Sequence, residues 1–291
     1  MRADRAVLFR AATNERLERA VRALPGGDAL AWRAASRYVA GRSRSEALQV
    51  AADLIGRGLG VSVDLFGEQV CDSSKAGLVA EEYLALAEAL PAPPADVWLS
   101  IDLSHLAVDV DPAGTTRLLG DVAAALPEGR RVQVGAEDAA RTDAVLGCVL
   151  EVARRGLAER IGATIQANLL RSADDADALA DAGVHIRLVK GAYVERVGTH
   201  PYGEETDIAF LQLAHQLAAA GATWSIATHD GRLREAVQLA LGPVPVEQLL
   251  GVRPELLDQL RRRAIPTRVY VPYGPDWFRY WLRRLAESRG A

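Results

Sequence analysis

The segment VHIRLVKGA, residues 184–192, shows most clearly which fold the chain adopts. Aliphatic and β-branched residues dominate it, and it runs into a glycine, as a short strand often does. Its apolar residues are nearly continuous, which is typical of a parallel strand that is covered on both faces. Similar runs occur at residues 61–66, 96–104, 131–136, 162–168, 223–229, 245–250 and 267–273, of which the run at 245–250 has the weakest pattern.

Between these runs lie alanine- and leucine-rich segments with helical spacing, namely 80–90, 115–126, 142–155 and 206–220. The starts of successive runs are 22 to 39 residues apart, the length of a strand together with a crossover helix. Eight such units predict an α/β protein with a (β/α)8 TIM-like barrel. A doubly wound open sheet is the alternative, because it shows the same alternation of strands and helices.

Residues 1–60 precede the first strand and carry apolar residues at helical spacing. Two or three N-terminal helices should therefore pack on a barrel formed by residues 61–291, and no linker rich in Pro, Gly or Ser separates the two parts. The stretch GRGLG, residues 56–60, is similar to a nucleotide-binding loop, but it precedes a strand instead of joining a strand to a helix. We interpret it as the end of a helix.

The composition argues against several classes of function. A net charge of −4, from 34 basic and 38 acidic residues, gives no reason to expect a nucleic-acid partner. The N-terminus lacks the apolar core of a signal peptide, and no apolar run reaches the roughly 18 residues of a spanning helix. We expect a cytoplasmic protein, with peripheral contact at the inner face of the membrane left open. The cysteines and histidines lack metal-ligand spacing, so no metal site is expected.

Polar residues at the carboxyl ends of the strands are the candidates for an active site, because barrel enzymes place their chemistry there. The segment RLVKGAY, residues 187–193, puts Arg187 and Lys190 on opposite sides of one strand. Buried charges need a partner or a ligand, and Gly191 would let a flat ligand approach the backbone. The alternatives are a structural salt bridge for Arg187 and a Schiff base on Lys190.

The last helical segment, residues 275–287, is amphipathic. One face is apolar and consists of Trp277, Phe278, Trp281, Leu282 and Leu285. The other face carries Tyr280, Arg283, Arg284 and Glu287. Adjacent arginines match the geometry of a carboxylate, which points to an anionic ligand. An ordinary solvated face with an Arg283–Glu287 pair is the alternative.

These motifs together resemble those of the proline dehydrogenase family. The matching segments are RLVKGAY (187–193), ATH (227–229), YVPYG (270–274) and YWLRRLAE (280–287), in the family's order, with weaker similarity at 38–41 and 65–68. The combination of RLVKGAY with Tyr-x-x-Arg-Arg is specific. The resemblance implies a barrel whose C-terminal helix lies over its mouth. It also implies FAD as the cofactor, and oxidation of L-proline to an imine with transfer of the electrons to a quinone.

The resemblance further implies roles for individual positions. Arg283 and Arg284 would bind the substrate carboxylate, while Tyr270 and Tyr280 would wall the ring pocket, with Leu249 packed against it. Arg187 would lie near the flavin N5, where a cation favours the reduced ring. The residues expected to contact FAD are Gln166, Arg187, Val189, Lys190, Gly191, Ala192, Tyr193, Thr228, His229, Asp230 and Glu287.

The sequence departs from the family pattern at several strand ends. Asp102 stands where the family has a lysine, and Gly135 stands where it has an aspartate. The first change reverses a charge in the substrate pocket, so we expect Asp102 to weaken the oxidation of free L-proline. Three further differences concern the flavin site, namely Gly203 for a lysine, Asp230 for an asparagine and Asn168 for an aromatic residue.

Three functions remain open from the sequence. The first is FAD-dependent oxidation of L-proline or of a proline-like cyclic or secondary amine. The second is a degenerate paralogue that binds flavin without turnover, and the third is a Schiff-base lyase that uses Lys190. The expected partners of the first are a small amine substrate with a carboxylate and a quinone or other electron acceptor.

Overall fold

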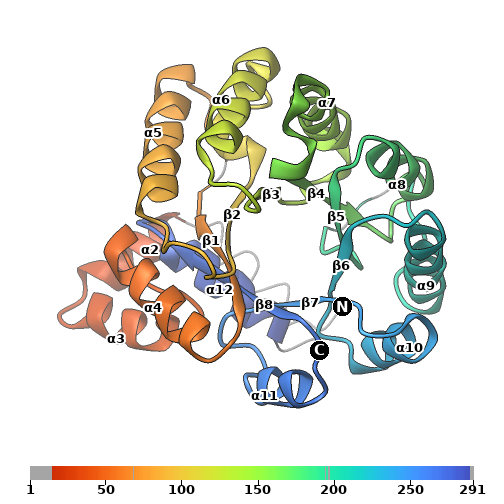
Figure 1. The fold of residues 1–291 in the computed structure, drawn as a ribbon. Coiled ribbons are helices and arrows are strands. Elements are labelled where there is room, and N and C mark those ends of the chain that lie inside the picture. The colour runs from red at the N-terminus through yellow and green to blue at the C-terminus, as the bar shows by residue number, and fades with distance from the viewer. Residues whose placement is uncertain (1–14, 68, 194, 196, 289–291) are drawn as a thin grey trace.

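Eight parallel strands close into a barrel in which each strand pairs with the next and β8 pairs with β1 (Figure 1). The computed structural model describes residues 15–288 except 68, 194 and 196, with side chains described from 18 to 284. The strands are β1 (Gly60–Leu65), β2 (Val97–Ile101), β3 (Val132–Val134), β4 (Ile161–Gln166), β5 (His185–Val189), β6 (Trp224–Ala227), β7 (Val246–Leu249) and β8 (Thr267–Tyr273). The predicted (β/α)8 barrel is confirmed, and the open-sheet alternative is wrong because β1 and β8 pair along their length.

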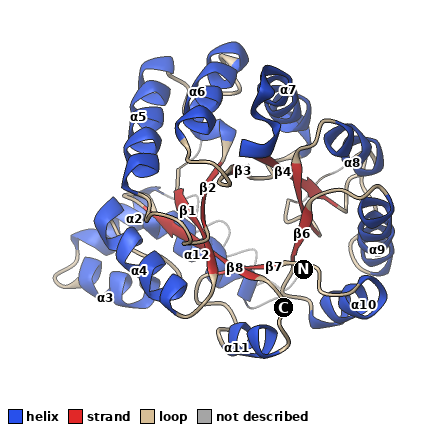
Figure 2. Ribbon diagram, viewed as in Figure 1, coloured by secondary structure: helices blue, strands red, loops and turns tan. Residues whose placement is uncertain are grey.

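A ring of helices surrounds the strands (Figure 2). The crossover helices are α5 (Ser73–Ala89), α6 (Pro112–Ala125), α7 (Thr142–Val152), α8 (Ser172–Asp181), α9 (Glu204–Ala219), α10 (Gly231–Leu241) and α11 (Glu255–Arg262). Each of these helices joins two consecutive strands. Because the chain crosses back through the helix, the two strands run in the same direction.

The outward faces of the strands form one continuous core with these helices. Val61, Val63, Ile186 and Leu188 are fully buried, and they belong to the same cluster as helical residues such as Leu119. Because helices cover this face and the barrel interior covers the other, the strands need the nearly continuous burial that the sequence pattern indicated.

The barrel interior is polar. The ring of Trp98 on β2 lies 5.0 Å from that of His185 on β5, and these strands are not neighbours, so the contact crosses the interior. The guanidinium of Arg268 on β8 stacks on the same indole at 3.3 Å. His185 Nδ1 lies 3.0 Å from Gln133 Oε1 on β3. Polar side chains of the interior are thus held by partners on distant strands, as buried polar groups require.

The helices α2 (Glu15–Ala23), α3 (Gly27–Ala35) and α4 (Arg44–Gly56) precede the barrel. The C-terminal helix α12 (Trp277–Ser288) packs against α3 through edge-to-face rings of Trp32 and Trp277, whose centroids are 5.1 Å apart. Apolar side chains of α3 and α12 form a second cluster beside the barrel core. The predicted apolar face of α12 is confirmed for Trp277, Phe278, Trp281 and Leu282, which lie in this cluster. The helix-end interpretation of residues 56–60 is also confirmed, because α4 ends at Gly56 and Gly58 has a φ of 78°.

Candidate active site

A wall of aromatic side chains joins α12 to the carboxyl ends of β1 and β8. The ring of Tyr280 lies 4.9 Å from Phe66, which follows β1, and 6.2 Å from Tyr270 on β8. Leu249 at the end of β7 pairs in register with Tyr270, so the two side chains leave the sheet on the same side. The structure thus brings together the three residues that were expected to form a ring pocket.

Arg283 and Arg284 extend from α12 along this wall. The guanidinium of Arg283 lies 4.9 Å from the centre of the Phe66 ring, and that of Arg284 lies 5.3 Å from the Tyr280 ring. Tyr280 itself is only 3% exposed. Tyr280 therefore does not lie on a solvated face, and Arg283 and Arg284 are half-buried against aromatic rings, whereas the Arg283–Glu287 pair of the alternative reading involves a side chain outside the described part. Glu287, the last residue of the expected set, has a side chain outside the part that the structure describes.

Arg187 points into the barrel and forms a buried ion pair with Glu247 on β7. Nη2 of Arg187 lies 2.6 Å from Oε2 of Glu247, and Ser225 on β6 donates to the other carboxylate oxygen at 2.6 Å. Burial alone would raise the pKa of Glu247, but the charge and hydrogen bond of Arg187 and the charges of Arg268 and His185 outweigh it and lower the pKa to about 2. Arg187 is thus held by a permanently ionised carboxylate.

Sequence reasoning missed Glu247 and Ser225. A signal existed for the glutamate, because a charged residue in the middle of a strand covered on both faces must find a buried partner. The salt-bridge alternative considered for Arg187 is therefore realised, although the partner lies two strands away and not on a neighbouring strand.

Asp64 on β1 is a second buried carboxylate. It is 3% exposed, and its Oδ2 accepts no hydrogen bond from any residue that the structure describes. Burial raises its pKa to about 7, opposed by the hydroxyls of Ser100 and Tyr270 and by the charge of Arg187. Asp64 thus lies among the groups that line the mouth, close to where a ligand would sit.

Asp102 follows β2, and its carboxylate occupies the space above Gly135, which follows β3. A Cβ built on Gly135 would overlap Oδ1 of Asp102. The charge of Asp102 also raises the pKa of Tyr270, after burial and the charges of Asp64 and Tyr280. The structure therefore places Asp102 over the end of β3, where Gly135 leaves room for its carboxylate.

The loop after β5 carries the remaining residues of RLVKGAY. Gly191 has a φ of 105°, and a Cβ there would overlap the side chain of Asn168, so this position excludes any other residue. Oδ1 of Asn168 accepts no hydrogen bond from the described residues. Val189 ends β5, whereas Ala192 and Tyr193 are exposed. The loop is therefore exposed at Ala192 and Tyr193, while the buried side chain of Asn168 fills the space beside Gly191.

Lys190 is paired with two carboxylates. Its Nζ lies 2.5 Å from Asp207 and 3.4 Å from Asp230. Burial would lower the pKa of Lys190, but the hydrogen bond and charge of Asp207 and the charge of Asp230 outweigh it and raise the pKa. A Schiff base requires the neutral amine, so this arrangement argues against a lyase that uses Lys190.

Three guanidinium groups surround His229 after β6. Burial and then the charges of Arg284, Arg253 and Arg234 lower the pKa of His229 to about 4, so the ring is neutral. Arg234 is 6% exposed, and within the described residues its Nη1 has no hydrogen-bond partner. Its Nη2 lies 3.6 Å from a Cβ built on Gly231, at the first residue of α10. This cationic group therefore lies at the N-terminus of a helix, where anions bind well.

Thr228 and Asp230 flank this histidine, and their side chains accept hydrogen bonds from backbone N–H groups. Asp230 N donates to Thr228 Oγ1 at 3.1 Å, and Asp230 Oδ1 accepts from the backbone N–H groups of Arg232 and Leu233 at 3.0 and 3.3 Å. Asp230 is thus the N-cap of α10.

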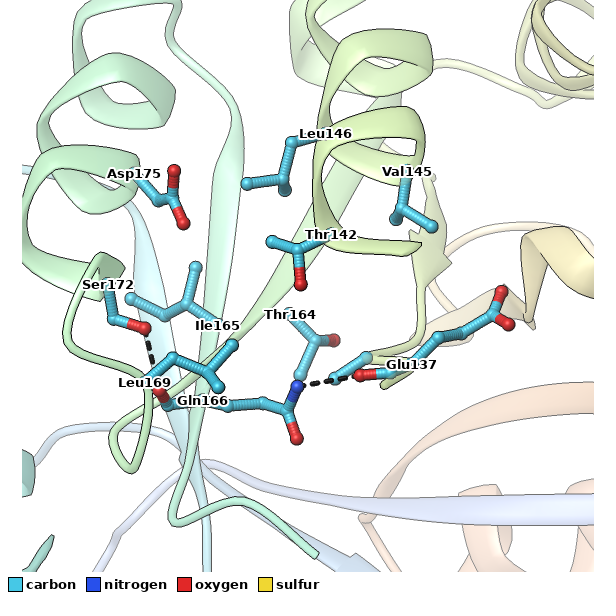
Figure 3. A pocket seen from close by; sticks show the side chains of 11 residues that line it. Glu137, Thr142, Val145, Leu146, Thr164, Ile165, Gln166, Leu169, Ser172 and Asp175 are labelled. Atoms are coloured by element: carbon cyan, nitrogen blue, oxygen red, sulfur yellow. Dashed lines mark hydrogen bonds between the residues drawn. The ribbon is translucent and has the colours of Figure 1, made fainter. Parts of the chain in front are cut away.

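A small cavity of about 20 Å³ lies between α7, α8 and the ends of β3 and β4 (Figure 3). Gln166 Nε2 donates to the backbone oxygen of Glu137 at 2.7 Å, and Ser172 Oγ donates to the backbone oxygen of Gln166 at 2.6 Å. The side chain of Gln166 is buried at the edge of this cavity, which has room for little more than a water molecule. It lies apart from the aromatic wall of the mouth.

No group of three or more His, Cys, Asp or Glu side chains among the described residues is placed to hold a metal ion. None of the helices described is both long and apolar enough to cross a membrane.

Comparison with known proteins places these motifs in one family. The family model described as "Proline dehydrogenase" matches residues 47–291. The chain is 33% identical over 269 residues to the proline dehydrogenase of Deinococcus radiodurans, which covers 88% of this chain and 87% of that protein. It is 31% identical over 262 residues to proline dehydrogenase 1 of Bacillus subtilis subsp. natto. This alignment covers 87% of this chain and 86% of that protein.

Solved structures of longer proteins share the fold. Proline utilization A from Bdellovibrio bacteriovorus superposes with a TM-score of 0.82 at 20% identity over 98% of this chain and 36% of that chain. The corresponding protein from Corynebacterium freiburgense gives a TM-score of 0.71 at 18% identity. This superposition covers 98% of this chain and 32% of that chain. The chain thus spans about a third of these proteins. Because the family match includes both the strand of Arg187 and the helix of Arg283 and Arg284, the chain belongs to the proline dehydrogenase family.

Proposed function

We propose that this protein oxidises L-proline, or a closely related cyclic amino acid, to the imine with FAD as the hydride acceptor. The observation that carries the proposal is the position of Arg283 against Phe66 and of Arg284 against Tyr280, whose ring lies 6.2 Å from that of Tyr270. Such a site combines a grip for a carboxylate with apolar walls for a small ring. Family membership supports the same reaction.

The residues after β5 and β6 fit FAD. Its diphosphate is an anion, and Arg234 offers an unused buried donor at the N-terminus of α10, with Arg253 and Arg284 nearby. The loop after β5 is exposed at Ala192 and Tyr193, which leaves it accessible to a flat ring. Gln166, Val189, Ala192, Tyr193, Thr228 and His229 line the same strand ends, and Lys190, Asp230 and Glu287 complete the proposed set.

Each side chain has a separate task in the proposed reaction. Arg283 and Arg284 would bind the substrate carboxylate and so fix the orientation of the ring. Tyr270, Tyr280 and Leu249 would exclude water from it. FAD, when bound, accepts the hydride from the carbon beside the substrate nitrogen. Arg187, held by Glu247, would keep a positive charge beside the flavin ring.

The same proposal includes the domain organisation, the electron acceptor and the location of the protein. Residues 61–291 would form the catalytic barrel, and residues 1–60 would support it. Electrons would leave to a quinone or another acceptor, which suits a cytoplasmic protein that contacts the inner face of the membrane.

Anaerobic titration of the FAD-loaded protein with L-proline and a panel of cyclic and secondary amines tests the proposal. We expect bleaching of the flavin absorbance by a cyclic amino acid. A protein that takes up FAD but is bleached by none of these amines would instead be the degenerate paralogue. A colourless protein that takes up no FAD would refute both.

A further inference from the structure

Glu247 on β7 holds one side of the Arg187 guanidinium group on β5. Nε of Arg187 donates to Oε2 of Glu247 at 2.9 Å, and Nη2 lies 2.6 Å from the same oxygen. Nη1 has no hydrogen-bond partner among the residues that the structure describes. The carboxylate therefore fixes the guanidinium from one side and leaves one amino group available to a ligand.

The carboxylate is itself held in place and stays ionised. Ser225 on β6 donates to its second oxygen at 2.6 Å. Burial alone would raise the pKa of this carboxyl group, but the charge and hydrogen bond of Arg187, and then the charges of Arg268 and His185, lower it to about 2. Glu247 is thus a fixed anion, and its ion-pair partner among the described residues is Arg187.

A structural role alone does not account for this pair. The side chains of Arg187 and Glu247 are 9% and 4% exposed, so both charges have lost most of their contact with water. Apolar residues of similar volume often replace a buried ion pair without loss of stability. The three strands are also joined by their backbone pairing. The pair is therefore better explained by a requirement for a cation at Arg187.

The separation of the two charges determines what a neighbouring ligand experiences. A lone guanidinium beside a flavin would strongly favour the reduced form, which helps the oxidation of an amine but opposes transfer of the electrons onward. A carboxylate 2.6 Å from the guanidinium offsets much of this effect, because the two opposite charges act on the ligand together. The charge balance of the pair would thus control how readily a flavin beside it is reduced.

We propose that Glu247, held by Ser225, acts through Arg187 to set the reduction potential of the bound FAD. This inference rests on the proposed function, since that function places Arg187 beside the flavin ring. Glu247 orients the guanidinium and offsets much of its charge, so that the flavin can accept electrons from the amine and still pass them to the acceptor. Glu247 is thus a positioning residue, because it acts through Arg187 and not on the substrate itself.

The test measures the midpoint potential of the FAD-loaded protein by anaerobic reduction together with a reference dye, so no amine substrate is needed. Glu247→Gln removes the charge of residue 247 but keeps its size. We expect it to favour flavin reduction about tenfold, a rise of about 30 mV for a two-electron couple. Glu247→Asp keeps the charge and should shift the potential by less than half as much. Glu151→Gln, which removes a surface charge, is the matched control and should leave the potential unchanged.

Arg187→Met combined with Glu247→Leu keeps the test decisive if Glu247→Gln does not fold, because apolar residues often replace a buried ion pair. Both charges are lost together, so we expect a potential close to that of the wild type. A fall of about 30 mV or more in this double variant would overturn the inference, since Arg187 would then act without compensation. Equal potentials of the wild type and Glu247→Gln, or equal shifts in Glu247→Gln and Glu247→Asp, would overturn it too. Failure of the proposed function looks different, since the wild type would then take up no FAD or hold FAD that none of the amines reduces.

Discussion

Arg187 on β5 and Glu247 on β7 form an ion pair inside the barrel that spans the intervening strand β6. Nε of Arg187 donates to Oε2 of Glu247 at 2.9 Å, and Ser225 of β6 donates to Oε1 at 2.6 Å. Both charged side chains are less than 10% exposed. Three consecutive strands are thus tied together inside the barrel.

Glu247→Gln should destabilise the protein strongly, because it leaves the buried charge of Arg187 without a counter-charge. We expect the free energy of unfolding to fall by about 3–5 kcal/mol in urea titrations. Glu151→Gln is the matched control, because Glu151 pairs with Arg154 and Arg155 at the surface, and its loss should cost less than about 1 kcal/mol. Equal effects of the two variants would contradict the structural role given to Glu247.

Asp64→Asn should stabilise the FAD-free protein increasingly as the pH rises. The pKa of Asp64 is raised from 3.8 to about 7 in the fold, so stability that is fully present below pH 3.8 is lost as the pH rises through about 7. The amide does not titrate, so its advantage over the wild type should grow across this window to the order of 2–4 kcal/mol. Urea titrations between pH 4 and 8 measure it, and a pH-independent difference would be evidence against a buried, titrating carboxylate.

Arg234→Met should weaken FAD binding at least tenfold, because it removes an unused buried donor from the N-terminus of α10. Reconstitution of the apoprotein, followed by flavin fluorescence, gives the dissociation constants. Arg232→Met on the same helix is the control, since Arg232 is exposed and should bind FAD as the wild type does. Similar constants for all three proteins would show that the diphosphate lies elsewhere.

Arg283→Met or Arg284→Met should weaken the binding of a carboxylate ligand by roughly 2–5 kcal/mol, while FAD largely stays bound. The reason is that one desolvated partner of the carboxylate is lost. Arg279→Met serves as control, because Arg279 on the same helix contacts Glu18 instead. Normal binding by both variants would leave these arginines with a purely structural role against Phe66 and Tyr280.

Asp102→Lys combined with Gly135→Asp should raise the rate of flavin reduction by free L-proline, by about tenfold or more. The double variant exchanges the charge at residue 102 and gives the new lysine a partner on the neighbouring strand. Gly135→Asp alone should be less stable, because its side chain collides with Asp102. Anaerobic stopped-flow measurements check the rate, and fast reduction by the wild type would refute the expectation that Asp102 slows proline oxidation.

The sequence by itself determined the strands, their parallel order and the segments that carry the site. Strands such as 184–192 need continuous apolar residues because helices and barrel interior cover both faces, and that requirement is visible in the residues themselves. The order of strands and helices then leaves few topologies. Even the end of α4 at Gly56 could be read from local chemistry.

Only the tertiary structure decided which polar groups meet. Glu247 lies 60 residues from Arg187 along the chain, and Asp102 meets Gly135 only because β2 and β3 are paired. The amphipathic pattern of α12 grouped Tyr280 with the arginines, but closure of the barrel buried that face against Phe66. Periodicity tells which face of an element a side chain occupies, whereas its partner depends on how distant elements pack.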